Sequence, residues 1–195
     1  MSLIVLTGAV RSGKSAMAEQ LAASRDRDVV VAVAGWDGDE EMARRIEAHR
    51  ASRPGEWTTV KAGIEPAWLA GVAEDAVLVL DCLGTLVSHA CYDAVGELEI
   101  APAGAEEAVG AQVDALLRAL LARAGDTIVV TNETGWGVVP AWPSARIFRD
   151  ELGRANRRLV AAADAAYLVV DGRCLDLKSL PERPAWPSAH EEGDR

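Results

Sequence analysis

Short apolar runs alternate along this chain with longer stretches in which apolar residues recur at helical spacing. A continuous apolar run of four or five residues is typical of a strand buried on both faces of a sheet. Such runs predict five strands, at 3–6, 29–33, 77–80, 127–130 and 167–170.

The longer stretches predict helices at 15–23, 39–51, 105–124 and 146–163, and a further helix after the third predicted strand. Pro54 follows the expected end of the second helix, and Ser144 is a candidate N-cap for the last one. We expect residues 96–104 to form a surface loop. Strands that alternate with helices imply right-handed βαβ crossovers and a mostly parallel sheet covered on both faces, which is an α/β fold of three layers.

Length and composition fit one compact domain, because half of the 195 residues are hydrophobic. We expect this domain at 1–180 and a loose, proline-rich and charged tail at 181–195. The formal net charge of −10 argues against a broad surface for nucleic acid or anionic membrane.

Three scattered cysteines without a CxxC pair argue against a disulfide framework or a zinc site, and fit a reducing cytosol. No apolar run approaches the roughly 20 residues that a membrane span needs. The N-terminus has no basic segment typical of a signal peptide, so the expected location is cytoplasmic.

One motif carries clear chemistry. The segment GAVRSGKS at 8–15 fits the pattern GxxxxGK[ST] and lies between a predicted strand and a predicted helix. Glycines let the backbone approach phosphates closely, and the successive amides at a helix N-terminus bind the anion. Lys14 is expected to reach the β and γ phosphates, and Ser15 to ligate Mg²⁺. The predicted phosphate-binding residues are Gly8, Ala9, Val10, Arg11, Ser12, Gly13, Lys14 and Ser15.

Asp81 ends the third predicted strand, VLVLD. A carboxylate at the carboxyl end of a strand beside a phosphate loop can hold the Mg²⁺ shell and so contribute to the nucleotide site. The alternative is an ordinary N-cap of the helix that follows.

Of the three histidines, His49 has the most suggestive neighbours. Arg45 precedes it by four residues and shares its helical face, and Arg50 and Arg53 follow. Neighbouring cations favour the neutral, nucleophilic form of an imidazole and also bind phosphate. However, Met42, Ile46 and His49 fall on one helical stripe, so a core histidine is an open alternative. We interpret His89 as structural, without a charged companion, and His190 as solvated.

Several segments together resemble a known family, the bifunctional adenosylcobinamide kinase / adenosylcobinamide-phosphate guanylyltransferases of the CobU/CobP type. The specific segments are DEEMARRIEAHRASRPGEW at 39–57 and VTNETGWGVVP at 130–140. GAVRSGKS at 8–15, LVLDCL at 78–83, RIFRDELGRANRRL at 146–159 and YLVVDG at 167–172 accompany them in the family's order. The resemblance implies a RecA-like P-loop NTPase fold.

The resemblance also implies an activity in cobalamin biosynthesis and cobinamide salvage. Such enzymes phosphorylate adenosylcobinamide with ATP or GTP and then transfer GMP from GTP to the new phosphate, through a guanylylated histidine and with release of pyrophosphate. His49 matches that histidine. Further nucleotide contacts are implied for Ala34, Gly35, Trp36, Arg50, Ala51, Ser52 and Arg53. The resemblance implies Mg²⁺ as the cofactor. It also implies that the chain assembles as a homo-oligomer, and suggests a trimer.

The chain departs from the family pattern at Ala9 and Val10, after Asp81, and at Lys61, where an acidic residue is expected near the nucleotide. Glu133, at the carboxyl end of the fourth predicted strand, is a candidate general base or a carboxylate that caps its loop. Two rival functions are a small-molecule P-loop kinase without a histidine adduct and a GTP-dependent switch. Residues 81–84 fit the DxxG pattern of switches, but TNET at 131–134 stands where Asn-Lys-x-Asp is expected.

Overall fold

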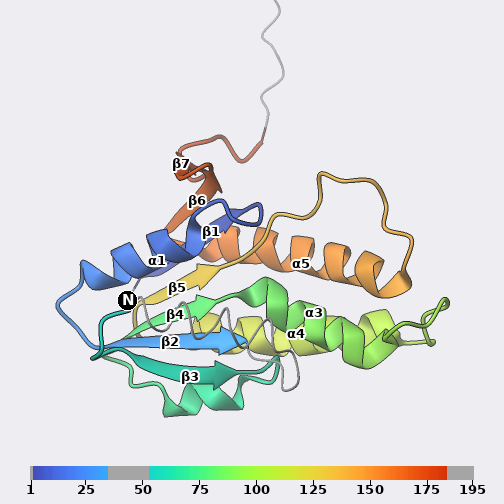
Figure 1. The fold of residues 1–195 in the computed structure, drawn as a ribbon, viewed down its shortest axis with the longest axis horizontal. Coiled ribbons are helices and arrows are strands. Elements are labelled where there is room, and N and C mark those ends of the chain that lie inside the picture. The colour runs from blue at the N-terminus through green and yellow to red at the C-terminus, as the bar shows by residue number, and fades with distance from the viewer. Residues whose placement is uncertain (1, 35–52, 184–195) are drawn as a thin grey trace, which may run out of the picture.

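A computed structural model describes residues 2–34 and 53–183 of the chain (Figure 1). Its centre is a seven-stranded sheet in the order β3-β2-β4-β5-β1-β6-β7. All neighbouring strands are parallel except β6 and β7, which form an antiparallel pair. The strands are β1 Leu3–Gly8, β2 Val29–Ala34, β3 Thr58–Ala62, β4 Val77–Asp81, β5 Thr127–Val130, β6 Ala165–Val170 and β7 Arg173–Asp176.

The described helices are α1 Lys14–Ala23, α3 Leu83–Val95, α4 Ala105–Ala122 and α5 Pro143–Ala162, together with a 3-10 helix, η1 Pro66–Gly71. Helix α5 begins differently from the prediction. Its N-cap is Trp142, which makes no side-chain cap hydrogen bond, and Ser144 lies inside the first turn. The Ser144 cap was therefore wrong, because Pro143 occupies the first helical position and its fixed φ already favours the helix there.

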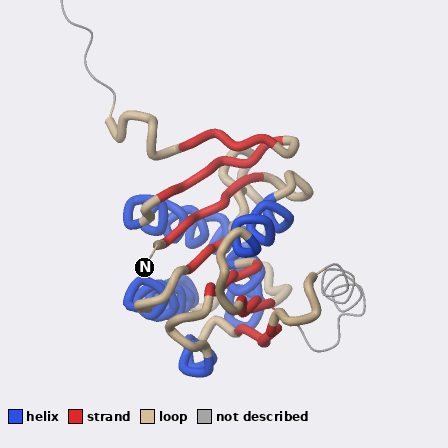
Figure 2. The backbone as a smooth tube through the Cα atoms, turned by 90° about the vertical axis from the view of Figure 1, so that its left-hand side faces the viewer, coloured by secondary structure: helices blue, strands red, loops and turns tan. Residues whose placement is uncertain are grey.

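The two faces of the sheet carry separate hydrophobic clusters, as the alternation of side chains along each strand requires. Leu6, Val31 and Val79 pack with Ala18 of α1 on one face. Residues one position away pack against α3, α4 and α5 on the other face. Figure 2 shows the strands stacked as one layer between helices. The predicted three-layer α/β fold with a mostly parallel sheet is confirmed.

Two strands were missed, β3 and β7, and both lie at an edge of the sheet. Every residue of β7 is exposed, and only Ala62 of β3 is buried. An edge strand buries little apolar surface, so TTVKA and RCLD lack the continuous apolar run that identified the five inner strands. The strand that ends at Asp81, expected as the third, is therefore the fourth in the chain.

Arg123 stabilises the edge of the sheet at which the parallel strands begin. The guanidinium of Arg123 donates to the carbonyl oxygens of Ala73 at 2.6 Å, Ala76 at 2.8 Å and Asp126 at 3.0 Å. Gly125 must lack a side chain here, because a Cβ would lie 2.2 Å from the backbone carbonyl oxygen of Glu74 and would also meet the Arg123 guanidinium. This group of contacts joins the loop before β4 to the loop before β5, far along the strands from their carboxyl ends.

None of the described helices is both long and apolar enough to cross a bilayer. The helix predicted at 39–51 lies outside the described residues, and so does most of the predicted tail, from residue 184 onward.

Candidate functional site

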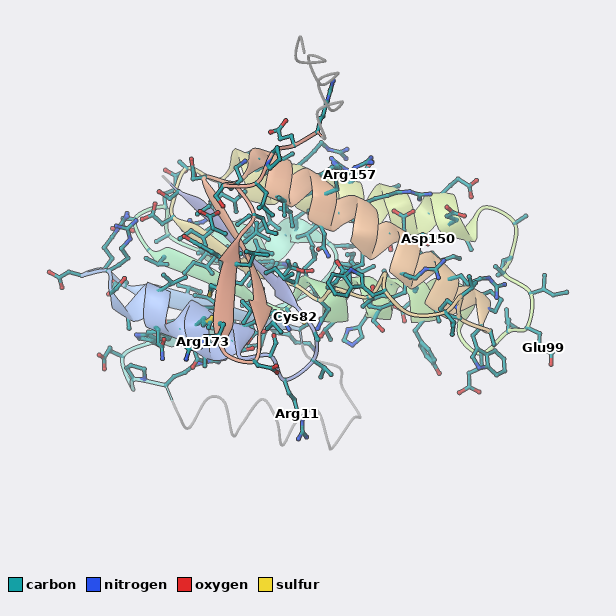
Figure 3. The ribbon with its side chains drawn as sticks, turned by 90° about the horizontal axis from the view of Figure 1, so that it is seen from above. Arg11, Cys82, Glu99, Asp150, Arg157 and Arg173 are labelled. Atoms are coloured by element: carbon teal, nitrogen blue, oxygen red, sulfur yellow. The ribbon has the colours of Figure 1, made fainter. Side chains whose placement is uncertain are left out.

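Three segments meet at the carboxyl edge of the parallel strands: the loop after β1, the residues after β4 and the loop after β5. Strand β5 lies between β1 and β4, so the phosphate loop and Asp81 come from strands that are not neighbours. Ligands of open α/β sheets bind at this edge, outside the carboxyl ends of the strands. Figure 3 shows Cys82 and Arg11 at this end of the molecule, with Arg11 pointing away from the sheet.

The phosphate loop has the conformation that its glycines predict. Gly8, Arg11 and Gly13 have φ values of 150°, 59° and 100°. A Cβ on Gly8 would lie 2.3 Å from the carbonyl oxygen of Val169 on β6, so only glycine fits. The turn between β6 and β7 supports the loop from outside, because the amide of Gly172 donates to Ser12 O at 2.9 Å.

Lys14 begins helix α1 and folds back over the loop. Its Nζ donates to Ala9 O at 2.6 Å and approaches Ser12 Oγ at 3.4 Å, with the residue only 6% exposed. Burial lowers the pKa of this ammonium, which outweighs the opposite effect of the Asp81 carboxylate and of Cys82 in its thiolate form. The cation therefore lies within the loop, where a bound anion would replace the carbonyl as its partner.

Asp81 and Cys82 lie at the carboxyl end of β4, at the same edge of the sheet as Lys14 and near enough to influence its pKa. Asp81 is half-buried at the end of β4, and the N-cap of α3 is Cys82, so the alternative of Asp81 as an N-cap is not what the structure has. Cys82 Sγ lies 3.1 Å from Thr85 Oγ1, and burial raises the pKa of its thiol, which stays protonated at neutral pH. Cys82 was missed as a site residue, although its position directly after Asp81 could have identified it.

The loop between β5 and α5, residues 131–142, is tied directly to the phosphate loop. The amide of Glu133 donates to Gly8 O at 3.1 Å. Glu133 Oε1 accepts from the amide of Gly135 at 2.6 Å, which is the loop-capping contact considered from the sequence. One carboxylate oxygen of Glu133 is thus engaged in the loop.

A buried asparagine on α5 holds the base of this loop. Asn156 Nδ2 donates to Asn132 O at 2.9 Å, and its Oδ1 accepts from Thr131 Oγ1 at 2.7 Å. Nearby, a Cβ on Gly84 of α3 would lie 2.5 Å from Asn132 Oδ1. The sequence carried a signal for Asn156, a polar residue on the apolar stripe of Leu152, Ala155 and Leu159, which we did not use.

The remaining described candidates do not join the Lys14 group. Ala34 is buried at the end of β2. Arg53 Nε donates to Glu19 Oε1 of α1 at 2.7 Å, which fixes the guanidinium against that helix. Lys61 is exposed near the end of β3.

His89 corrects one detail of the sequence interpretation. It does have charged neighbours: burial lowers the pKa of its imidazole, Asp93 raises it and Lys61 lowers it. The balance is a depressed pKa, so the ring is neutral at pH 7. Its place on α3 fits the structural role expected from the sequence.

Several predicted site residues lie outside the described part of the chain, namely Gly35, Trp36, Arg45, His49, Arg50, Ala51 and Ser52. His190 also lies outside it.

The chain is similar to proteins of known activity along nearly its whole length. The family described as cobinamide kinase / cobinamide phosphate guanyltransferase matches residues 4–177. The bifunctional adenosylcobalamin biosynthesis protein CobU of Escherichia coli K12 is 36% identical over 181 residues, which cover 90% of this chain and 99% of that protein. The corresponding CobP of Pseudomonas aeruginosa is 33% identical over 91% of this chain and 98% of that protein.

Solved structures also align with the chain. A KaiC-like protein from Pyrococcus horikoshii OT3 aligns with a TM-score of 0.47 and 16% identity, over 86% of this chain and 70% of that one.

Proposed function

Since this chain belongs to the cobinamide kinase / cobinamide phosphate guanyltransferase family, we propose that one site, built on the phosphate loop, performs both reactions in succession. The observation that carries the proposal is the loop of residues 8–15, with the buried Lys14 cation folded over it and the Glu133 loop attached to it. Supporting it is the family match over residues 4–177.

In the kinase reaction, the loop amides and Lys14 bind the β and γ phosphates of ATP or GTP. Lys14 then exchanges its contact with Ala9 O for phosphate oxygens and stabilises the charge that develops during transfer. The hydroxyl of adenosylcobinamide attacks the γ-phosphorus in line, the bond to the β–γ bridging oxygen breaks, and the nucleoside diphosphate leaves. Glu133 is the candidate acceptor of the hydroxyl proton, because its backbone already contacts Gly8.

The residues present fit a magnesium ion. Ser15 offers a hydroxyl in the first turn of α1, and Asp81 offers a carboxylate at the end of β4 beside Lys14. Hydroxyl and carboxylate oxygens are ligands that Mg²⁺ prefers. When bound, the ion would neutralise charge on the phosphates.

In the transfer reaction, neutral His49 attacks the α-phosphorus of GTP and the bond to the α–β bridging oxygen breaks, so pyrophosphate leaves. A phosphate oxygen of adenosylcobinamide phosphate then attacks the same phosphorus and the N–P bond breaks, which frees the histidine and yields adenosylcobinamide-GDP. One displacement is thereby divided into two. Gly35, Trp36, Arg45 and residues 50–53 are proposed to bind the guanine nucleotide, and Ala34 to contact it from β2.

We further propose that residues 1–180 form the catalytic domain and that residues 181–195 form a tail. The chain is proposed to work as a homo-oligomer, with a trimer as the first expectation. Its proposed location is the cytoplasm. The family match ends at residue 177, close to the proposed domain boundary.

A labelling experiment tests the two-step route. The protein is incubated with GTP labelled at the α-phosphorus and then denatured. We expect bound label that is labile to acid and stable to base, present in the wild type and in His89→Ala and absent in His49→Ala. A histidine-free kinase or a switch would retain none. Label that persists in His49→Ala would overturn the assignment of the nucleophile.

The kinase step needs its own measurement. Transfer of label from the γ-phosphate of ATP or GTP to adenosylcobinamide is expected in the wild type and in His49→Ala, because the hydroxyl attacks the nucleotide directly. Loss of kinase activity in a folded His49→Ala variant would contradict the separation of the two reactions.

A further inference from the structure

The β5–α5 loop, residues 131–142, carries the largest exposed apolar side chains beside the phosphate loop. Val138 is 92% exposed, Trp136 83% and Val139 67%. Trp142, at the start of α5, is 54% exposed. Exposed apolar groups clustered in one short segment mark a binding surface more often than a solvated loop.

The loop is held in place at both ends, so these side chains are presented from a fixed base. At one end Glu133 donates to Gly8 O, and Asn156 fastens Thr131 and Asn132. At the other end Arg146 Nη1 donates to Pro140 O at 3.1 Å and also to Ala141 O. Figure 1 shows the segment leaving β5 beside the phosphate loop and reaching over to the far end of α5.

The geometry points to this loop as the surface that binds the corrin ring of cobinamide, a role that rests on the proposed function. The hydroxyl that is phosphorylated must reach the γ-phosphate above Lys14, and a short side arm connects it to the ring. The ring must therefore lie just outside the phosphate loop. The β5–α5 loop is joined to the phosphate loop by the bond from the Glu133 amide to Gly8 O. It presents the exposed side chains of Trp136, Val138 and Val139 next to the exposed Val10 of the phosphate loop itself.

Size and charge agree with that occupant. A corrin ring offers a broad face rimmed with methyl and amide groups, and each tryptophan can bury roughly 150–250 Å² against such a face. The corrin ring and the adenosyl ligand are anionic, and together they cancel all but one of the positive charges of cobalt(III). Adenosylcobinamide is therefore a cation. The formal net charge of −10 on the chain attracts such a substrate.

The test measures the KM for adenosylcobinamide and for nucleotide in Trp136→Ala, Trp142→Ala and Trp136→Phe, with the sedimentation of each variant. We expect Trp136→Ala to raise the KM for adenosylcobinamide about tenfold, as the loss of one aromatic contact implies. The KM for nucleotide and the oligomeric mass should not change, and Trp136→Phe, which keeps an aromatic face, should stay near the wild type. Leu180→Ala is the matched control, because Leu180 is 47% exposed and follows β7, whose last residue pairs with Tyr167 toward the amino end of β6 and so away from this loop.

Three results would overturn the inference. An unchanged KM for adenosylcobinamide in both alanine variants would remove the ring from this loop. A fall in oligomeric mass would make the surface an interface between copies of the chain. An equal rise in both KM values would indicate a structural role. A wild type that binds GTP but neither binds nor phosphorylates adenosylcobinamide would instead refute the proposed function itself.

Discussion

Gly8 lies against Val169 so closely that a methyl group on its Cα would stand 2.3 Å from the Val169 carbonyl oxygen. Val169 belongs to β6, which pairs with β1, so this contact fixes the phosphate loop against the sheet at its first residue. The loop's shape is therefore a property of the packed sheet as well as of its own glycines.

Gly8→Ala should accordingly lose both stability and nucleotide binding. The new Cβ meets backbone that cannot move cheaply, and Gly8 has a φ of 150°, which suits glycine. We expect a loss of about 2 kcal/mol or more in the free energy of unfolding, measured by denaturant titration, and no detectable GTP binding. Gly153→Ala is the control: nothing lies within 4 Å of that position on α5. It should stabilise the protein by about 0.5–1 kcal/mol. Normal GTP affinity in Gly8→Ala would contradict the steric argument.

Lys14→Met should slow catalysis strongly while removing the cost of a buried charge. We expect kcat to fall by about 10² to 10³, as for loss of a cation that stabilises transition-state charge. Because burial lowers the pKa of Lys14 below 10.5, the unfolded chain holds this proton more tightly than the folded one. The stability of the wild type relative to Lys14→Met should therefore rise with pH in the window between the lowered pKa and 10.5. Thermal melts of both proteins across that range measure the difference. If the stability of the wild type relative to Lys14→Met instead fell as the pH rises, the pKa of Lys14 would be raised in the folded protein and not lowered.

Glu133→Gln separates the two roles considered for this carboxylate. A glutamine oxygen can still accept from the Gly135 amide, so the loop cap survives, but glutamine accepts no proton. If Glu133 is the general base, kcat of the kinase step should fall by about 10² to 10⁴ with thermal stability unchanged. Glu133→Ala, which loses the cap too, should be less stable than Glu133→Gln. A Glu133→Gln enzyme with wild-type kcat would leave only the capping role.

Asn156→Leu should disturb the site from α5 without touching substrate. The change leaves Asn132 O and Thr131 Oγ1 without their partner in a buried place, which costs about 2–3 kcal/mol. Thr131→Val removes one of the two contacts and should cost about 1 kcal/mol. Both values come from equilibrium unfolding, and the double variant should show strong non-additivity, because the two side chains share a hydrogen bond. Fully additive losses would show that the pair is not coupled.

Arg123→Lys should lower the free energy of unfolding without changing the kinetic constants. Lysine cannot reproduce the planar set of contacts to Ala73, Ala76 and Asp126, so we expect a loss of about 2–4 kcal/mol. KM and kcat of the folded protein should not change, since this contact lies at the opposite edge of the sheet from Lys14. Arg158→Ala, which breaks an exposed ion pair with Asp114, should cost less than about 0.5 kcal/mol. If Arg123→Lys and Arg158→Ala lowered the free energy of unfolding by similar amounts, the contacts of Arg123 would not have the structural role given to them here.

The sequence by itself determined the inner five strands, the described helices α1, α3, α4 and α5, and the phosphate loop. These features rest on local patterns: a strand buried on both faces must be continuously apolar, and a phosphate loop needs glycines and a lysine at fixed spacing. The position of Asp81 was found in the same way, because it ends a buried strand. The role predicted for His49 came from the resemblance to the family and not from periodicity, and it stays a prediction because His49 lies outside the described residues.

Only the tertiary structure decided which residues meet at the strand ends. Asn156 lies 24 residues from Asn132 along the chain, and Val169 lies far from Gly8, yet both contacts shape the site. The edge strands β3 and β7 also escaped the sequence, because their residues bury too little to leave a pattern. Long-range contacts depend on how whole elements pack, and packing is specified by the entire core, not by the few residues that touch.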